Sequence, residues 1–322
     1  MKFALVLITY NHERFIEEAL QSILSQTRVP DEVVIADDAS KDSTPALIRA
    51  FVERHGLQGR WTVLLSETNQ GINGNLQNAI NHTTADVIVP LAGDDLALPN
   101  RVAASERAFL ANPEFNIVAD SGYVIDEQGA PVRDYTLQAG VVDDIRKALR
   151  IGSPLLMPVG QSWRRRMFDR FGPLPLDVPN EDDQVTFWGL MTGGILCTAE
   201  HTFKYRLHGA SASSWLRTGQ SNRAYVDRYL RDTRVRHAHM LHWRRALLGS
   251  DRADRDELAR AADLRAAAYG ALEQIEALPF HRRIGKLVGL WRGTSLKERV
   301  YLFFGTAGVV GWRKLRVWTG RA

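Results

Sequence analysis

Cysteine and long apolar runs are the two features that the sequence lacks most clearly. The single cysteine, Cys197, excludes a disulfide within the chain and a cysteine-based zinc site, and such sparse use of cysteine is typical of the reducing cytoplasm. No segment reaches the ~20 apolar residues that span a bilayer. The apolar run at residues 3–8 is too short for a secretion signal. We therefore predict a cytoplasmic protein in which this run is a buried strand.

The two common glycine-rich nucleotide motifs are also missing. The turn over residues 9–13 reads TYNHE, which is not the G-x-G-x-x-G of a dinucleotide-binding fold, and no P-loop occurs in the chain. Any nucleotide must therefore be held by side chains and a metal.

Acidic residues are almost absent from the C-terminal segment. Residues 281–322 contain ten Lys or Arg and one acid, Glu298, so this segment carries about +9 while the whole chain carries +4. Basic and aromatic residues mix there, at Arg282, Arg283, Lys286, Arg292, Lys297, Arg299, Tyr301, Phe303, Phe304, Trp312, Arg313, Lys314, Arg316 and Trp318. This mixture is typical of a helix on an anionic membrane surface; a partner helix or a dimer contact is the alternative. The charge would also attract nucleic acid, but no nucleic-acid-binding signature accompanies it.

The first half of the sequence alternates between strand and helix patterns. Apolar runs predict strands over residues 3–9, 32–37, 61–66, 86–91 and 117–121, and helical spacing predicts helices over 13–25, 43–55, 75–81 and 101–110. This alternation is typical of a Rossmann-like, mixed but mainly parallel sheet flanked by helices. Residues 182–191 predict one further helix, and the sequence after residue 221 is almost purely helical in propensity up to Pro279. We expect a catalytic domain over residues 1–215 and a helical, basic extension over 216–322.

Two aspartate pairs stand where apolar runs end. Asp37 and Asp38 follow one predicted strand, and Asp94 and Asp95 follow another. Ligands of open α/β sheets bind at this edge. Four carboxylates gathered there would repel one another unless a divalent metal, usually with a phosphate-bearing ligand, lay between them. The pairs therefore indicate a nucleotide and a metal, although adjacent aspartates also occur as turn formers and helix caps.

Four motifs together resemble glycosyltransferase family 2, whose members are inverting enzymes with the GT-A fold. They are residues 7–11 (LITYN), 22–27 (SILSQT), 35–44 (IADDASKDST) and 93–95 (GDD), the last followed by Leu98-Pro99. The resemblance extends over about residues 1–210.

The resemblance implies a donor site at the strand ends. It assigns Thr9 and Tyr10, as well as Asp37 and Asp38, to the nucleotide base and ribose. It also places Asn75 beside the nucleotide, although many members carry a basic residue near there. A glycine-rich turn that ends in a helix cap is the alternative reading of that stretch.

The GDD motif matches the metal motif of the family. By the resemblance Asp95 is the metal ligand and Asp94 lies nearer the ribose, while Arg206 and His208 of the downstream YRLH element could meet the diphosphate or the metal. The ion would be Mg²⁺ or Mn²⁺, because a leaving diphosphate needs a cation and hard cations take carboxylate oxygens.

A third acidic cluster, EDD at residues 181–183, precedes the predicted helix over 182–191. It resembles the motif that supplies the catalytic base of the family. Inversion needs one carboxylate to take the proton of the attacking hydroxyl. By the resemblance, the family's usual spacing to Gly193-Gly194 favours Asp182 as the base, with Asp183 as the runner-up. The cluster could instead only cap the helix and complement its dipole.

The resemblance, together with the acidic sites, implies a metal-dependent inverting glycosyltransferase that uses a nucleoside-diphosphate sugar. UDP is the favoured base, with dTDP and GDP as alternatives, and we expect a glycan or lipid-linked acceptor in bacterial surface polysaccharide or glycolipid biosynthesis. The protein would lie in the cytoplasm or peripherally on the inner membrane. A nucleotidyltransferase, which would need a basic glycine-rich loop after the first strand, and a non-catalytic sugar-nucleotide scaffold are the competing hypotheses.

Overall fold

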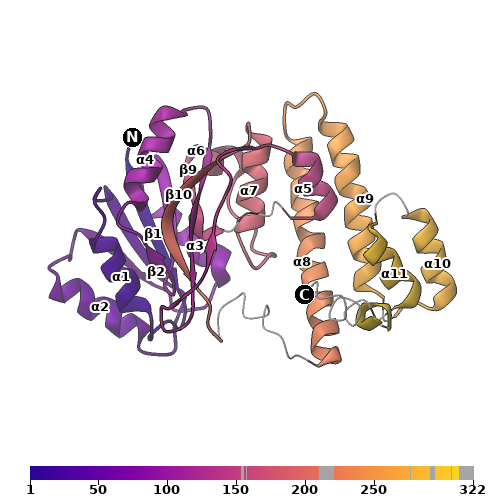
Figure 1. Cartoon of the computed structure of the whole chain (residues 1–322), viewed down its shortest axis with the longest axis horizontal. Helices are drawn as coiled ribbons and strands as arrows, with labels where there is room; N and C mark the ends of the chain where they lie inside the picture. Colours follow the sequence, from indigo (N-terminus) through magenta and orange to yellow (C-terminus); the bar gives the residue numbers. More distant parts are fainter. Residues whose placement is uncertain are drawn as a thin grey trace. The chain divides into compact units, whose positions relative to one another are not determined.

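The computed structural model describes residues 1–153, 156, 158–209, 221–275, 277–290, 294–305 and 307–311. The chain divides into two compact units (Figure 1). The first comprises residues 1–144 and 155–215, and the second comprises residues 145–154 and 216–322. A short segment in the middle of the sequence therefore belongs to the same unit as the C-terminal region.

A ten-stranded sheet forms the centre of the first unit, in the order β3-β2-β1-β4-β9-β6-β10-β5, with β7 beside β6 and β8 beside β10. The strands are β1 (Phe3–Thr9), β2 (Glu32–Asp37), β3 (Trp61–Leu65), β4 (Val87–Ala92), β5 (Leu96–Ala97), β6 (Ile117–Ile125), β7 (Pro131–Tyr135), β8 (Gly140–Val142), β9 (Gln161–Arg164) and β10 (Ile195–Arg206). Strands β1 to β4 pair in parallel, and so do β6 and β10. Strand β9 runs antiparallel between β4 and β6.

Helices accompany this sheet: α1 (Ile16–Leu24), α2 (Thr44–Arg54), α3 (Gly71–Asn81), α4 (Arg101–Ala111), α6 (Arg166–Phe171) and α7 (Asp182–Met191). The predicted mainly parallel sheet flanked by helices is confirmed, and the predicted strands and helices of the first 121 residues all form. Strand β5 and strands β7 to β10 were not predicted.

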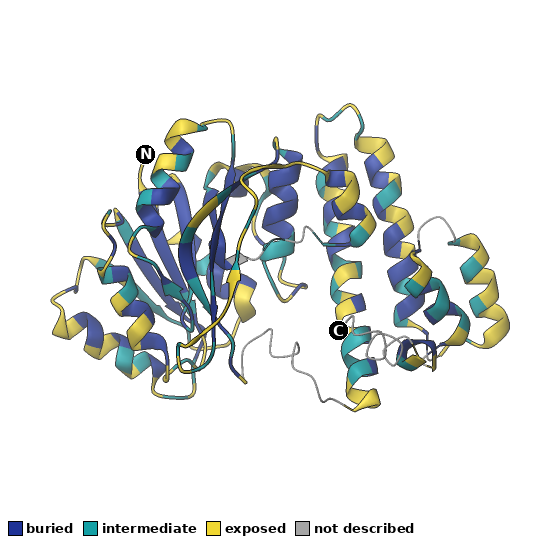
Figure 2. Cartoon of the chain, viewed as in Figure 1, coloured by how far each residue is buried: buried dark blue, intermediate teal, exposed yellow. Residues whose placement is uncertain are grey.

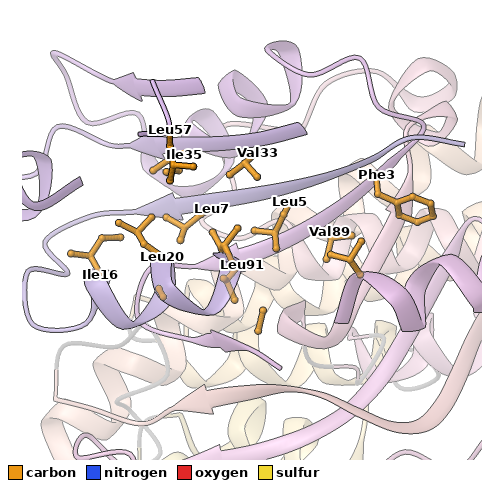
Figure 3. Close-up of a cluster of buried hydrophobic side chains, with 14 of the residues drawn as sticks. Phe3, Leu5, Leu7, Ile16, Leu20, Val33, Ile35, Leu57, Val89 and Leu91 are labelled. Carbon is orange, nitrogen blue, oxygen red and sulfur yellow. The ribbon is translucent and has the colours of Figure 1, made fainter. Parts of the chain in front are cut away.

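The core of this unit joins the apolar faces of the central strands and α1. Strand β1 is an unbroken apolar run because both of its faces are covered, as expected of a central parallel strand. Leu5 and Leu7 of β1 lie near Ile16 and Leu20 of α1 (Figure 3). Figure 2 shows the same concentration of buried residues along the strands. Each such side chain contributes about 1.5–3 kcal/mol on burial, so the core fixes the strand ends that carry the site.

The second unit is helical. It contains α5 (Ile145–Ile151), α8 (Asn222–Leu248), α9 (Arg255–Glu273), α10 (Phe280–Gly289) and α11 (Leu296–Phe304). Within it, Arg265 of α9 donates two 2.9 Å hydrogen bonds to the carboxylate of Glu298 in α11. Tyr269 of α9 donates to the carbonyl of Ile151 at 3.3 Å and so holds α5. No helix among the described residues is long and apolar enough to cross a membrane.

Candidate functional site

The parallel register brings the ends of three strands to one edge of the sheet. Thr9 at the end of β1 pairs with Asp37 at the end of β2, and Ile8 pairs with Ala92 at the end of β4. Asp94 follows two residues after Ala92. Because ligands of such sheets bind beyond the carboxyl ends of the strands, this edge is the place to look for a donor site.

The Asp37 and Asp38 carboxylates are both buried and both hydrogen-bonded to neighbouring loops. Asp37 accepts from the backbone N–H of Ser40 at 2.9 Å and from its hydroxyl at 2.5 Å. Asp38 accepts from the N–H groups of Gln70 and Gly71, at 2.7 and 2.9 Å, and so caps the start of α3. Burial raises the pKa of Asp38, and these two hydrogen bonds oppose the rise. Asp38 therefore performs the capping role that was the alternative to nucleotide contact.

The loop after β1 is tied to the loop after β2. Asn11 adopts a positive φ of 54°, donates its N–H to the Ser40 hydroxyl at 2.8 Å and accepts from the Lys41 N–H at 2.8 Å. Tyr10, beside it, is 42% exposed. The loop is therefore fixed in place while the Tyr10 ring stays open to solvent.

Asn75 lies on α3, next to the strand-end edge. Its amide donates to the carbonyl of Ala36 at 2.8 Å, and the residue is buried. Its Oδ1 has no hydrogen-bond partner among the described residues. A buried polar atom without a partner costs about 1–3 kcal/mol, so a ligand that donated a hydrogen bond here would recover that cost.

Three metal-ligating side chains meet at the end of β4. The His12, Asp94 and His208 ligand atoms all lie within 4.8 Å of one another. His208 Nε2 is 2.9 Å from Asp94 Oδ2, and His12 Nε2 is 3.7 Å from the same oxygen. The other ring nitrogen of His12 lies 3.2 Å from the Thr9 hydroxyl. A proton on Nδ1 that is donated to Thr9 would leave the Nε2 lone pair directed at the cluster, an arrangement typical of metal-binding histidines.

Gly93 makes this arrangement possible. A Cβ at position 93 would lie 2.6 Å from Thr9 Oγ1 and 2.9 Å from His12 Nδ1, which is closer than real side chains approach. The absence of a side chain lets the β4 turn approach the β1 turn, and so brings Asp94 to His12.

The charge states of His12 and Asp94 suit a cation. Burial lowers the pKa of His12 and so favours its neutral ring. Burial alone would raise the pKa of Asp94, but the hydrogen bond from His208 and the neighbouring imidazoles lower it below its usual value. A neutral imidazole and an ionised carboxylate are the forms that bind metals.

Asp95 has different surroundings from Asp94. Its Oδ1 accepts the backbone N–H of Arg206 at 2.8 Å, and it is not one of the three clustered residues. Burial and then the charge of Asp94 raise its pKa well above the usual value. This geometry favours Asp94 over Asp95 as the carboxylate that would face a cation, the reverse of the order that the sequence predicted.

Arg206 is a buried connector. Its side chain donates to the carbonyls of Asp94 and Glu127, at 3.0 and 3.1 Å, and to the carboxylate of Glu18 at 2.6 Å. All three guanidinium nitrogens therefore have protein partners. To contact a diphosphate, as predicted, Arg206 would have to give up one of these three protein acceptors.

The third acidic cluster opens α7, with Glu181 at the N-cap position. Asp182 accepts hydrogen bonds from the Asn180 amide and from the Asp183 N–H. Burial raises the pKa of Asp182, and burial together with Asp182 raises the pKa of Glu181 to about 8. A carboxylate with a raised pKa is a stronger base at neutral pH.

His12 is the member of the cluster that the sequence analysis did not assign. The signal was present, because His12 stands three residues after Thr9 in the turn that leaves β1. That turn ends at the same sheet edge as the β4 turn.

Comparison with known proteins identifies the family. The protein-family model described as "Glycosyl transferase family 2" matches residues 4–171, slightly more than half of the chain. The chain belongs to glycosyl transferase family 2. Among curated family relatives, the "Putative glycosyltransferase EpsE" of Bacillus subtilis is 29% identical over 128 residues. That stretch covers 40% of this chain and 45% of EpsE, so the match spans less than half of the relative's length.

Two solved structures share the fold. Staphylococcus aureus TarS 1–349 in complex with UDP-GlcNAc superposes with a TM-score of 0.62 at 17% identity, over 97% of this chain and 89% of that one. The mannosyltransferase PcManGT from Pyrobaculum calidifontis, in complex with GDP-Man and Mn²⁺, gives 0.55 at 18% identity, over 99% and 87%. Because the sequence identity is low, the structural likeness bears on the fold alone. It confirms the predicted GT-A-type fold, including a helical C-terminal region.

Proposed function

We propose that this family 2 protein is a divalent-cation-dependent, inverting glycosyltransferase that moves a sugar from a nucleoside diphosphate to an acceptor hydroxyl. The main support is the cluster of His12, Asp94 and His208 at the same sheet edge as Thr9 and Asp37. It offers a cation site where a donor diphosphate would lie. The expectation of a glycan or lipid-linked acceptor in surface polysaccharide or glycolipid assembly rests on the family resemblance.

The cluster fits a divalent cation. Its ligand atoms are two imidazole nitrogens and one carboxylate oxygen. The Thr9 hydroxyl orients the His12 ring through its other nitrogen, Nδ1. Such a mixed set suits Mn²⁺ better than Mg²⁺, which prefers oxygen ligands throughout. When bound, the cation would neutralise charge on the leaving diphosphate. The protein residues that would hold it are His12, Asp94 and His208.

The remaining donor contacts would come from the strand ends and α3. Asp37 is fixed by Ser40. The buried Oδ1 of Asn75 has no hydrogen-bond partner among the described residues, and we propose that a donor group of the nucleotide reaches it. Tyr10 is exposed beside them. UDP remains the favoured base, with dTDP and GDP as alternatives; the related folds bind UDP-GlcNAc and GDP-Man.

Asp182 would act as the base, with Asp183 as the runner-up. The acceptor oxygen forms a bond to the anomeric carbon while the bond from that carbon to the diphosphate breaks on the opposite face. The acceptor proton passes to the Asp182 carboxylate. The hydrogen bonds from Asn180 and Asp183 hold that carboxylate at the start of α7, and its raised pKa strengthens it as a base.

Slow donor hydrolysis provides a test that needs no known acceptor. The purified protein would be incubated with UDP-GlcNAc, UDP-glucose, dTDP-glucose and GDP-mannose, with and without Mn²⁺. We expect Mn²⁺-dependent release of nucleoside diphosphate from one donor, and proton NMR should show the released sugar first in the anomeric configuration opposite to the donor's. Release with retention would contradict an inverting reaction. Binding of a donor without any turnover would favour the scaffold hypothesis, and absence of both binding and turnover would contradict the proposed function.

A further inference from the structure

Helix α10 exposes an apolar stripe. None of its residues is buried. Phe280, Ile284 and Val288 follow one another at intervals of four, which places them on one face of the helix, and all three are exposed, Val288 at 71%. Arg282 and Lys286 lie on the opposite, polar side of this short helix, and both are exposed.

Helix α11 also exposes apolar side chains. Its buried residues, Glu298, Tyr301 and Leu302, face inward. Leu296 and Phe304, which helical spacing places on the other side, are exposed, Phe304 at 58%. The two helices contact each other, and the rings of Phe280 and Phe303 meet at 5.3 Å. We call Phe280, Ile284, Val288, Leu296 and Phe304 the hairpin patch; Figure 2 shows the exposed surface of α10 in yellow.

Within the described residues 277–305, the exposed charge is all of one sign. Glu298 is the sole acid in the described residues 277–305, and it is buried in its pair with Arg265. Lys297 and Arg299 are partly exposed. The two helices of the patch therefore present apolar side chains together with exposed charges that are only basic.

We propose that the hairpin patch docks on an anionic lipid surface. A helix with an apolar face and a basic polar face lies in the plane of the membrane interface, with the apolar side chains inserted and the basic ones near lipid phosphates. Nucleic acid would satisfy the charge but would leave the apolar side chains without a partner. Exposed apolar patches of this kind mark interaction sites, and the charge selects an anionic lipid.

The inference concerns the second unit and does not depend on the proposed reaction. It also refines the sequence prediction of a membrane contact. Part of that prediction, at Arg292, Trp312, Arg313, Lys314, Arg316 and Trp318, lies outside the described residues.

Vesicle co-flotation of the full chain tests the proposal. Vesicles of phosphatidylcholine with phosphatidylglycerol should bind the protein at least about tenfold more tightly than phosphatidylcholine alone, and added salt should weaken the binding. Val288→Glu should weaken it about tenfold, because a charge replaces an inserted side chain. Leu110→Glu, at a comparably exposed position on α4, is the matched control and should bind like the wild type.

A second pair of variants distinguishes an effect of where the charge lies from an effect of the net charge. Arg282→Glu with Lys286→Glu should weaken binding at least about 25-fold, since each basic residue near the surface accounts for about fivefold. Arg231→Glu with Arg234→Glu makes the same net-charge change at exposed positions on α8 and should have a much smaller effect. Circular dichroism would check that every variant folds.

Three results would overturn the proposal. The first is no binding to the anionic vesicles at low salt. The second is vesicle binding that the two α10 variants weaken no more than the control variants on α4 and α8 do. The third is a dimer, seen by light scattering, that Val288→Glu dissociates while vesicle binding is absent; the patch would then be an interface between two copies of the chain.

Discussion

Asp94 and Asp95 are neighbours in the sequence, yet their surroundings give them opposite properties. Asp94 faces two imidazoles, which lower its pKa, whereas Asp95 is buried against the Arg206 N–H and its pKa is raised. A turn directs consecutive side chains differently, and the sequence alone does not say which one faces His208. The resemblance located the pair, and the surroundings seen in the structure favour Asp94 as the one that would face a cation.

The position of the His12 ring could not be predicted from the sequence either. Its ring reaches Asp94 because Asn11 adopts a positive φ and because position 93 lacks a side chain. Both conditions lie in loops, where sequence patterns constrain conformation least. The carboxylates could be found from the strand ends, since apolar runs mark those ends clearly.

Asp182→Asn tests the assignment of the base at the scale of one residue. The amide keeps the size and one acceptor oxygen but cannot take a proton. We expect kcat for sugar transfer to fall about 10²–10⁴-fold, with donor affinity unchanged. Steady-state kinetics and a donor titration would measure the two effects. Asp183→Asn is the matched comparison, and a larger kcat loss there would move the base to Asp183.

Strand β10 is the element that the sequence analysis missed and the site depends on. It pairs with β6 in parallel and ends at Arg206, two residues before His208. Its sequence, ILCTAEHTFKYR, contains charged residues because its middle is partly exposed, so it lacks the apolar signature that identified β1 and β4. Strands β1, β2 and β4 were predictable because they are buried on both faces.

The buried Asp120 carboxylate of β6 and the Arg101 guanidinium of α4 lie beside the threonines of β10. Thr198 and Thr202 of β10 donate to the Asp120 carboxylate of β6, at 2.6 and 3.1 Å. Arg101 of α4 lies in the same core and donates to the Pro90 carbonyl at 3.0 Å. Burial raises the pKa of Asp120 to about 6, against the opposing effects of the Thr198 hydrogen bond and the Arg101 charge.

This raised pKa predicts a pH dependence of stability. The folded state holds the Asp120 proton more tightly than the unfolded state, so the stabilisation is complete below about pH 4 and is lost as the pH rises through about 6. The loss is on the order of 3 kcal/mol, because about two pH units separate the two pKa values. Urea unfolding of the wild type and Asp120→Asn across this range would measure it. A stability difference between them that did not change with pH would contradict the prediction.

At the scale of the whole molecule, the chain crosses between its units more than once. Helix α5 belongs with the C-terminal helices, where Tyr269 holds the Ile151 carbonyl and Arg146 pairs with Glu257. A seven-residue helix carries too little signal to reveal this from sequence. The predicted boundary at residue 215 would therefore separate α5 from its partners.

A fragment that ends at residue 209 tests this organisation. It retains the sheet but lacks α9, so residues 145–151 should lose their protection against hydrogen exchange. Strands β1 and β4 should stay protected, because their partners are all retained. Exchange mass spectrometry of the fragment and the full chain would compare them. Equal protection of residues 145–151 in both would contradict the assignment of α5 to the C-terminal unit.

The central claim is that His12, Asp94 and His208 form a cation site for a nucleoside diphosphate. Isothermal titration with UDP, dTDP and GDP, with and without Mn²⁺, tests it most directly. We predict that the wild type binds one nucleotide only with Mn²⁺ and that Asp94→Asn weakens this binding at least about tenfold. Asp134→Asn, at an exposed position on β7, should bind like the wild type. Unchanged Mn²⁺-dependent binding by Asp94→Asn, or no binding of any of the three nucleotides by the wild type, would contradict the claim.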